Sequence, residues 1–129
     1  MEREPIPDDV SRFVLLSIPS VPYLEAMLLF RREKAEPWDA KRLAERIYVS
    51  EKVARALLSD LLASGVLAAA DPVASQYIYQ PQSEPLGKMI DRLAECYSKN
   101  LVDITNLIHS KTSKKAQQFA DAFLWRKDS

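Results

Sequence analysis

Apolar residues recur at helical spacing along most of the chain, and short polar stretches separate the runs. The first two runs cover residues 8–18 and 21–34, and Pro19 between them cannot continue a helix because its ring clashes with the preceding turn. Asp8 or Asp9 is placed to cap the first run, since a short side-chain oxygen accepts hydrogen bonds from the free amides of a helix start. The pattern predicts two consecutive helices here.

Two shorter helices are predicted next, joined by only two residues. Asp39 caps the first, and Ser50 caps the second, in which leucines recur at helical spacing. Gly65 follows the second helix and fits the left-handed residue with which many helices end. A link of two residues holds the end of the first helix close to the start of the second.

The segment after Gly65 is predicted to form a β-hairpin. Residues 66–70 and 76–80 can pair as strands across a loop that contains Asp71 and Pro72, which favour a turn. Only two glycines occur in the whole chain, which argues against an all-β fold rich in tight turns. The expected fold class is therefore mainly α with a small β-hairpin.

Residues 86–110 are predicted to form one long helix of about 37 Å, at 1.5 Å per residue. Its apolar residues follow alternating steps of four and three, which is the spacing of a coiled-coil seam, with Asn100 at the one polar place. The alternative is that this helix packs only on its own domain, but a helix this long would overhang so small a body. A last amphipathic helix is predicted over residues 113–126. The residues expected to form a homodimer contact are Leu86, Ile90, Leu93, Tyr97, Leu101, Ile104, Leu107, Phe119 and Phe123.

The order of these elements resembles a known protein family. Two short capped helices, with Ala44 in the first, lead through the sequence LLASGVL into a pair of strands. This combination resembles the winged helix-turn-helix of bacterial transcriptional regulators, of the multiple-antibiotic-resistance or phenolic-acid-response type. The resemblance implies an N-terminal helical extension (residues 1–19), a winged helix-turn-helix domain (20–81) and a C-terminal helical dimerisation region (82–129).

In such regulators the second helix of the motif enters the major groove of DNA and the wing touches the backbone. Carried over to this chain, the resemblance places Ser50, Lys52, Arg55 and Ser59 on the DNA-facing side of the second helix. Three cations of the first helix, Lys41, Arg42 and Arg46, would flank the phosphate backbone. The expected function is that of a DNA-binding transcriptional regulator acting as a homodimer on double-stranded DNA.

The charge distribution leaves a second function open. The chain carries 18 basic and 18 acidic side chains, and a neutral balance does not favour strong nonspecific binding to nucleic acid. Residues 31–55 hold eight basic and five acidic side chains, a slight local excess. The wing has no Arg or Lys. A winged helix that binds another protein through an apolar wing tip, without a DNA role, is the alternative.

Few residues carry catalytic or ligand-binding chemistry. The chain has one histidine, His109, and one cysteine, Cys96, and it lacks paired metal-ligand spacings and a glycine-rich phosphate loop. We therefore expect no enzyme activity, no metal and no cofactor. A pocket for a small effector, lined by Phe13, Tyr23, Tyr97 and Phe119, is a further hypothesis with only aromatic composition to support it.

The location of the protein is predicted from two absences in the sequence. No apolar run approaches the length of a membrane span, and the acidic N-terminus lacks the pattern of a signal peptide. A single cysteine excludes an internal disulfide framework. The expectation is a cytoplasmic protein without a membrane partner.

Overall fold

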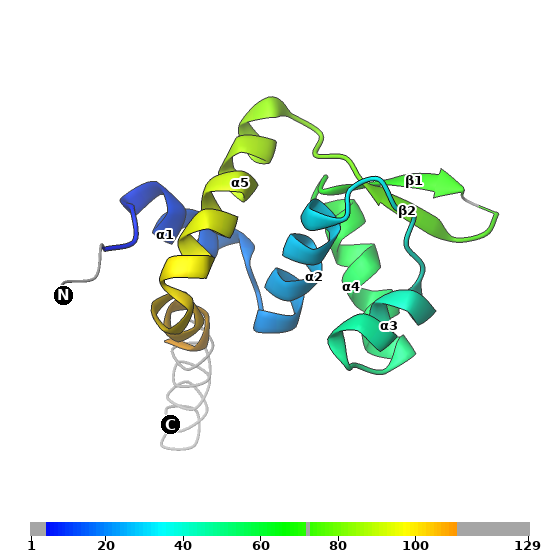
Figure 1. Cartoon of the computed structure of the whole chain (residues 1–129), viewed down its shortest axis with the longest axis horizontal. Coiled ribbons are helices and arrows are strands. Elements are labelled where there is room, and N and C mark those ends of the chain that lie inside the picture. The colour runs from blue at the N-terminus through cyan, green and yellow to red at the C-terminus, as the bar shows by residue number, and fades with distance from the viewer. Residues whose placement is uncertain (1–4, 72, 111–129) are drawn as a thin grey trace, which may run out of the picture.

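The computed structural model describes residues 5–71 and 73–110, which are mainly helical with one small sheet (Figure 1). This confirms the predicted class. Residues 101–110 form a further helix at the end of the described chain. The other elements, in order, are α1 (Asp8–Ser17), α2 (Val21–Arg32), α3 (Ala40–Ile47), α4 (Glu51–Ala63), β1 (Leu67–Asp71), β2 (Gln76–Tyr79) and α5 (Glu84–Lys99).

Side-chain caps begin most of the helices. Ser20 Oγ accepts from the Tyr23 amide at the start of α2, and Ser83 Oγ accepts from the Leu86 amide at the start of α5. The first helix is different, because the residue before its first turn is Pro7, which gives no side-chain cap. The prediction that Asp8 or Asp9 caps α1 is therefore wrong. Both acids lie inside the first turn, where negative charge still favours the positive end of the helix dipole.

The end of α4 sets the direction of the hairpin. Gly65 has a φ of 79°, as predicted for a left-handed helix terminus. Its N–H donates to the Leu62 carbonyl at 3.1 Å, and the Val66 N–H donates to the Leu61 carbonyl at 3.0 Å. These two bonds satisfy carbonyls that the end of a helix would leave free, and they turn the chain directly into β1.

The hairpin is attached to the segment that precedes α3. β1 and β2 are antiparallel with Leu67 opposite Tyr79, and the register shifts between Ala69 and Asp71. Trp38 pairs with Tyr77 as an additional bridge: the Trp38 N–H donates to the Tyr77 carbonyl at 2.7 Å, and the Tyr77 N–H donates back at 2.8 Å. The hairpin is thus fixed to the body at its middle.

Helix α2 lies at the centre of the hydrophobic core. Six of its residues are buried, and it contacts α3, α4 and β2 (Figure 1). The rings of Phe30 in α2 and Trp38 meet edge to face, with centroids 5.2 Å apart. Arg31 Nε donates to Asp91 Oδ1 at 2.7 Å, which adds a polar link from α2 to α5. No single described helix is long and apolar enough to cross a membrane, although α1 and α2, bent by 114°, meet the length and composition criteria as a pair.

The predicted single helix over residues 86–110 is wrong, because it is interrupted at Asn100. Helix α5 ends at Lys99, Asn100 takes φ −128° and ψ 44°, and the chain continues as helix 101–110 in a new direction (Figure 1). Ile104 and Ile108 on this second helix are at most 1% exposed. The break turns these residues back into the core of their own chain.

Several residues expected on a dimer seam therefore lie inside one chain. Ile90, Leu93 and Ile104 are fully buried within the single chain, and their contact with a second copy stays a prediction. Leu101 remains 53% exposed. Three others, Leu86, Tyr97 and Leu107, are partly buried against the core. Phe119 and Phe123 lie outside the described residues.

Replacing Gly65 with alanine should lower the free energy of unfolding by about 1–2 kcal/mol, because an L-residue is disfavoured at this positive φ. The added Cβ would also overlap the side chain of Gln82, which would have to move. Gly87, which lies inside α5, is the matched control. Its added Cβ would be 3.7 Å from the nearest Pro81 atoms, and alanine there should stabilise by up to about 1 kcal/mol. Urea unfolding of both variants checks this, and equal effects would contradict it.

Candidate nucleic-acid interface

The corner between α3 and α4 is held by side-chain caps on both helices. Asp39 Oδ1 accepts from the Arg42 amide at 2.8 Å, and Ser50 Oγ accepts from the Val53 amide at 3.1 Å. These are the two caps expected from the sequence. Between the helices, Tyr48 adopts a left-handed conformation with φ 59°, which reverses the chain within two residues. The corner thereby fixes which side of α4 faces outward.

Four of the predicted DNA-contacting residues share the exposed side of α4 and its cap. The helix buries Ala54, Leu57, Leu58 and Leu61, so its opposite face is open to solvent. Lys52 and Arg55 have no ion-pair partner among the described residues. Two acids, Glu51 and Asp60, are also exposed, so the helix has no net charge. The predicted residues on this side are Ser50, Lys52, Arg55 and Ser59, and all four are exposed.

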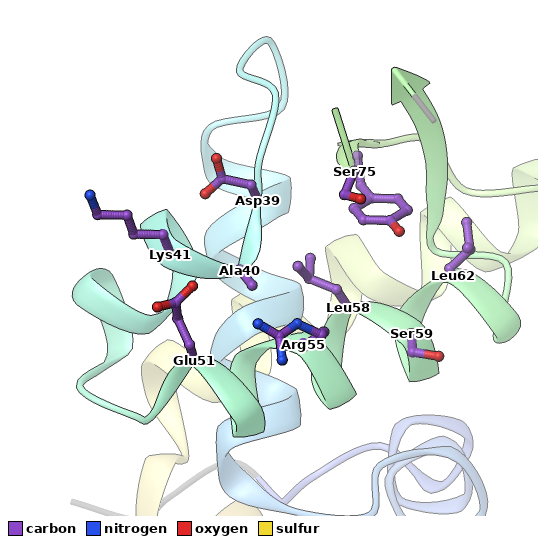
Figure 2. A pocket seen from close by; sticks show the side chains of 10 residues that line it. Asp39, Ala40, Lys41, Glu51, Arg55, Leu58, Ser59, Leu62 and Ser75 are labelled. Carbon is purple, nitrogen blue, oxygen red and sulfur yellow. The ribbon is translucent and has the colours of Figure 1, made fainter. Parts of the chain in front are cut away.

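A groove of about 580 Å³ separates this part of α4 from the hairpin and the start of α3. Figure 2 shows Arg55 beside Leu58 in the groove, with Ser59 and Leu62 further along α4 and Ser75 contributed by the hairpin. Lys41 lines it from the first turn of α3, where it too lacks an ion pair in the described chain. The structure thus brings Lys41, Arg55 and Ser59 to one site.

Arg42 and Arg46 are not brought to that site, because both are engaged around Trp38. The guanidinium carbon of Arg42 lies 4.3 Å from the centre of the Trp38 ring, and that of Arg46 lies 5.5 Å from it. Arg42 also donates to the Pro37 carbonyl at 3.0 Å and contacts Glu36 at 3.4 Å. A cation above an aromatic face and beside a carboxylate is a stabilising arrangement within the fold. The prediction that these two arginines flank DNA has no support from their positions.

Arg46 forms a two-pronged pair with Glu33. Its Nη1 and Nη2 donate to the two carboxylate oxygens at 3.1 and 2.5 Å. The hydrogen bonds from Arg46 hold the pKa of Glu33 below its ordinary value, and they raise the pKa of Arg46. Since the two residues are 13 positions apart, no helical spacing in the sequence indicated this pair.

The hairpin supplies shape to the groove but no positive charge. Between Leu67 and Tyr79 the only charged side chain is Asp71, whose Oδ1 accepts from the amides of Val73 and Ala74. Val73 at the tip is 97% exposed. At the base, burial raises the pKa of Tyr79 to about 12, and the nearby Asp91 adds to the rise. Because its oxygen accepts from two amides of the turn, the Asp71 carboxylate stabilises the hairpin tip, and its negative charge cannot attract a phosphate.

Tyr48 is an exposed residue that sequence reasoning did not select. Its side chain is 93% exposed in the turn before Ser50, although a non-glycine residue with positive φ is uncommon. It lies at the edge of a second groove of about 430 Å³, which Tyr97, Ile47 and Arg32 also line. The two-residue link was visible in the sequence, but its left-handed conformation was not.

The hypothetical effector pocket is not assembled as expected. Phe13 and Tyr23 line one cavity of about 260 Å³, with the Tyr23 hydroxyl 3.0 Å from Ser64 Oγ. Burial raises the pKa of Tyr23, and the hydrogen bond to Ser64 partly opposes the rise. Tyr97 lies in the separate groove beside Tyr48. Phe119 is outside the described residues.

No metal site is found in the described chain, where no group of three or more potential ligand side chains gathers. The chain matches no protein-family model, no curated protein and no solved structure.

Replacing Glu33 with glutamine should lower the free energy of unfolding at neutral pH by removing the ionised pair with Arg46. The pKa of Glu33 is below its ordinary value of 4.5 in the fold, so the pair stabilises fully above about pH 4.5. The difference between wild type and E33Q should shrink as the pH falls below 4.5 and Glu33 becomes protonated. Urea unfolding at a series of pH values measures it. In an Arg46→Gln background the same substitution should show no such pH dependence, and an unchanged dependence there would refute the assignment.

Proposed function

We propose that residues 20–81 form a winged helix-turn-helix domain that binds double-stranded DNA, with α4 as the recognition helix, and that the protein acts as a homodimeric transcriptional regulator. The observation that carries the proposal is the exposed face of α4, which presents Lys52, and on which Arg55 and Ser59 line a groove bounded by the hairpin. A helix of this kind fits the major groove, while the adjacent hairpin lies over the backbone.

The two cations of α4 have the properties that DNA contact requires. Lys52 and Arg55 are exposed and have no ion pair among the described residues, so binding would not first have to break an internal pair. Arg55 can donate two hydrogen bonds to a guanine edge, and both cations can neutralise a phosphate. Ser50 and Ser59 can donate to phosphate oxygens. With Arg42 and Arg46 assigned to the fold, Lys41 is the remaining cation of α3 for the backbone.

A homodimer would allow a specific DNA site to be recognised although each α4 helix contacts only a few base pairs. One α4 helix reads few base pairs, and two copies related by a twofold axis read two half-sites about one helical turn apart. The proposal therefore includes a short palindromic target. A neutral chain also needs this second contact more than a basic chain would, because nonspecific attraction to phosphate is weak.

Binding of a random duplex at about 50–200 mM salt tests the DNA role, because each phosphate contact adds about 0.9 to the slope of log affinity against log salt. Replacing both Lys52 and Arg55 with alanine should reduce that slope by up to about 1.8 if both contact phosphate. Fluorescence anisotropy of a labelled duplex gives the measurement.

The matched control removes one arginine and one lysine from elsewhere on the surface. Arg12→Ala with Lys88→Ala changes the net charge by the same amount on α1 and α5, which lie across α2 from α4 (Figure 1). Its salt slope should equal that of the wild type. Equal slopes for both double variants would show that α4 does not touch DNA.

A second candidate function is favoured by the charge of the hairpin. A wing without cations, with Asp71 in its turn and Val73 exposed, suits contact with a protein better than contact with phosphate. In this case the domain is an interaction adaptor without DNA binding. Absence of any binding to duplex at the lowest salt, in wild type and variants alike, would favour the adaptor over the regulator.

A further inference from the structure

The apolar repeat of the C-terminal part continues through the break at Asn100. Steps of four and three residues connect Leu93, Tyr97, Asn100, Ile104 and Leu107 without a shift in register. A repeat of seven residues maintained in this way is typical of one continuous helix that packs along a seam. The structure instead has two helices, α5 and helix 101–110, that meet at one non-helical residue.

Nothing in the local sequence forces this break. The residues around it, from 98 to 103, include neither proline nor glycine, which are the usual causes of a sharp kink. The Asn100 N–H still donates to the Cys96 carbonyl at 2.7 Å, and the Asn100 carbonyl accepts from Ile104 at 3.0 Å. Helical hydrogen bonds therefore reach the joint from both sides, and only the dihedral angles of Asn100 separate the two helices.

Tertiary packing supplies the reason for the bent form. Ile104 and Ile108 are at most 1% exposed, and a straight helix would carry both away from the core of their own chain. In the first turn of helix 101–110, Leu101 is 53% and Val102 is 55% exposed immediately after the joint. The bent chain thus buries one apolar pair and leaves another pair in water.

We propose that Asn100 is a hinge at which α5 and helix 101–110 straighten into one helix, so that two copies of the chain exchange their 101–110 helices. In the exchanged dimer, Ile104 and Ile108 of each chain occupy in the partner the sites that they fill in the monomer. No buried apolar contact is lost by the exchange. The inference rests on the homodimer of the proposed function and specifies how it forms.

The exchange also accounts for the exposed pair beside the hinge. Where the two straightened helices cross, Leu101 and Val102 of one chain meet the same residues of the other, and their apolar surface leaves water. Asn100, which is only 6% exposed in the bent chain, lies on the seam face of the straightened helix with Tyr97 and Ile104. Joining two helices into one also connects hydrogen-bonding groups that helix ends leave outside the ladder.

The first test changes the helix-forming tendency of the hinge. Asn100→Leu should raise the dimer association constant about tenfold, since a better helix former favours the straight form in both chains. Asn106 lies exposed on the same helix, so Asn106→Leu is the matched control and should leave the constant unchanged. Light scattering after size-exclusion chromatography over a range of concentrations gives both constants.

The second test detects the exchange without altering the hinge. Ser11 in α1 and Ser110 at the end of the described chain line the same surface pocket. In a Cys96→Ala background, chains with a donor dye at Ser11→Cys are mixed with chains that carry an acceptor at Ser110→Cys. Energy transfer between chains in the dimer should equal the transfer within a doubly labelled monomer. This measurement does not depend on whether the Asn100 variant folds.

The outcomes separate this inference from the proposed function. A dimer in which transfer remains within each chain, with little between chains, would overturn the exchange and leave a homodimer formed by another surface. A wild type and an Asn100→Leu variant that are both monomeric at the highest concentration would overturn the exchange and the homodimer together. DNA binding by α4 is measured independently of either result.

Discussion

The burial of Trp38 is the interaction on which the arrangement of the helices and the hairpin depends. Its backbone exchanges two hydrogen bonds with Tyr77 of β2, and its ring meets Phe30 of α2 edge to face. Arg42 and Arg46 of α3 cover the ring with their guanidinium groups. One side chain, fully buried, therefore connects three parts of the fold that are separate in the sequence. Together with the turn at Gly65, this connection fixes the hairpin beside α4, with the groove between them.

The same interaction divides the cations of the helix corner into two groups. Arg42 and Arg46 face Trp38 and the acids Glu36 and Glu33, so their charge serves the fold. Arg55 and Lys41 line the groove without such partners in the described chain. A basic residue on a helix-turn-helix is thus not by itself a contact for DNA, because a ring and a carboxylate nearby can satisfy it first.

Local features of the helix ends were predictable from the sequence, and contacts between distant segments were not. The caps Asp39 and Ser50 and the left-handed Gly65 were predicted, because each depends on a side chain and the backbone within three residues of it. The pairing of Arg46 with Glu33 was not, since the two meet only when the segment between α2 and α3 folds back. The break at Asn100 was also missed. A seven-residue repeat records which residues are apolar, and it does not record whether their partners lie in the same chain or in another.

The sequence by itself determined the order of the first four helices, the caps of α3 and α4, the left-handed end of α4 and the hairpin. These are local consequences of side-chain size, polarity and hydrogen bonding over a few residues. Only the tertiary structure decided which cations remain free, where Tyr48 is exposed and in which direction helix 101–110 runs. Those features depend on contacts between residues far apart in the chain, where the burial of Trp38, Ile104 and Ile108 outweighs the local preference of any one segment.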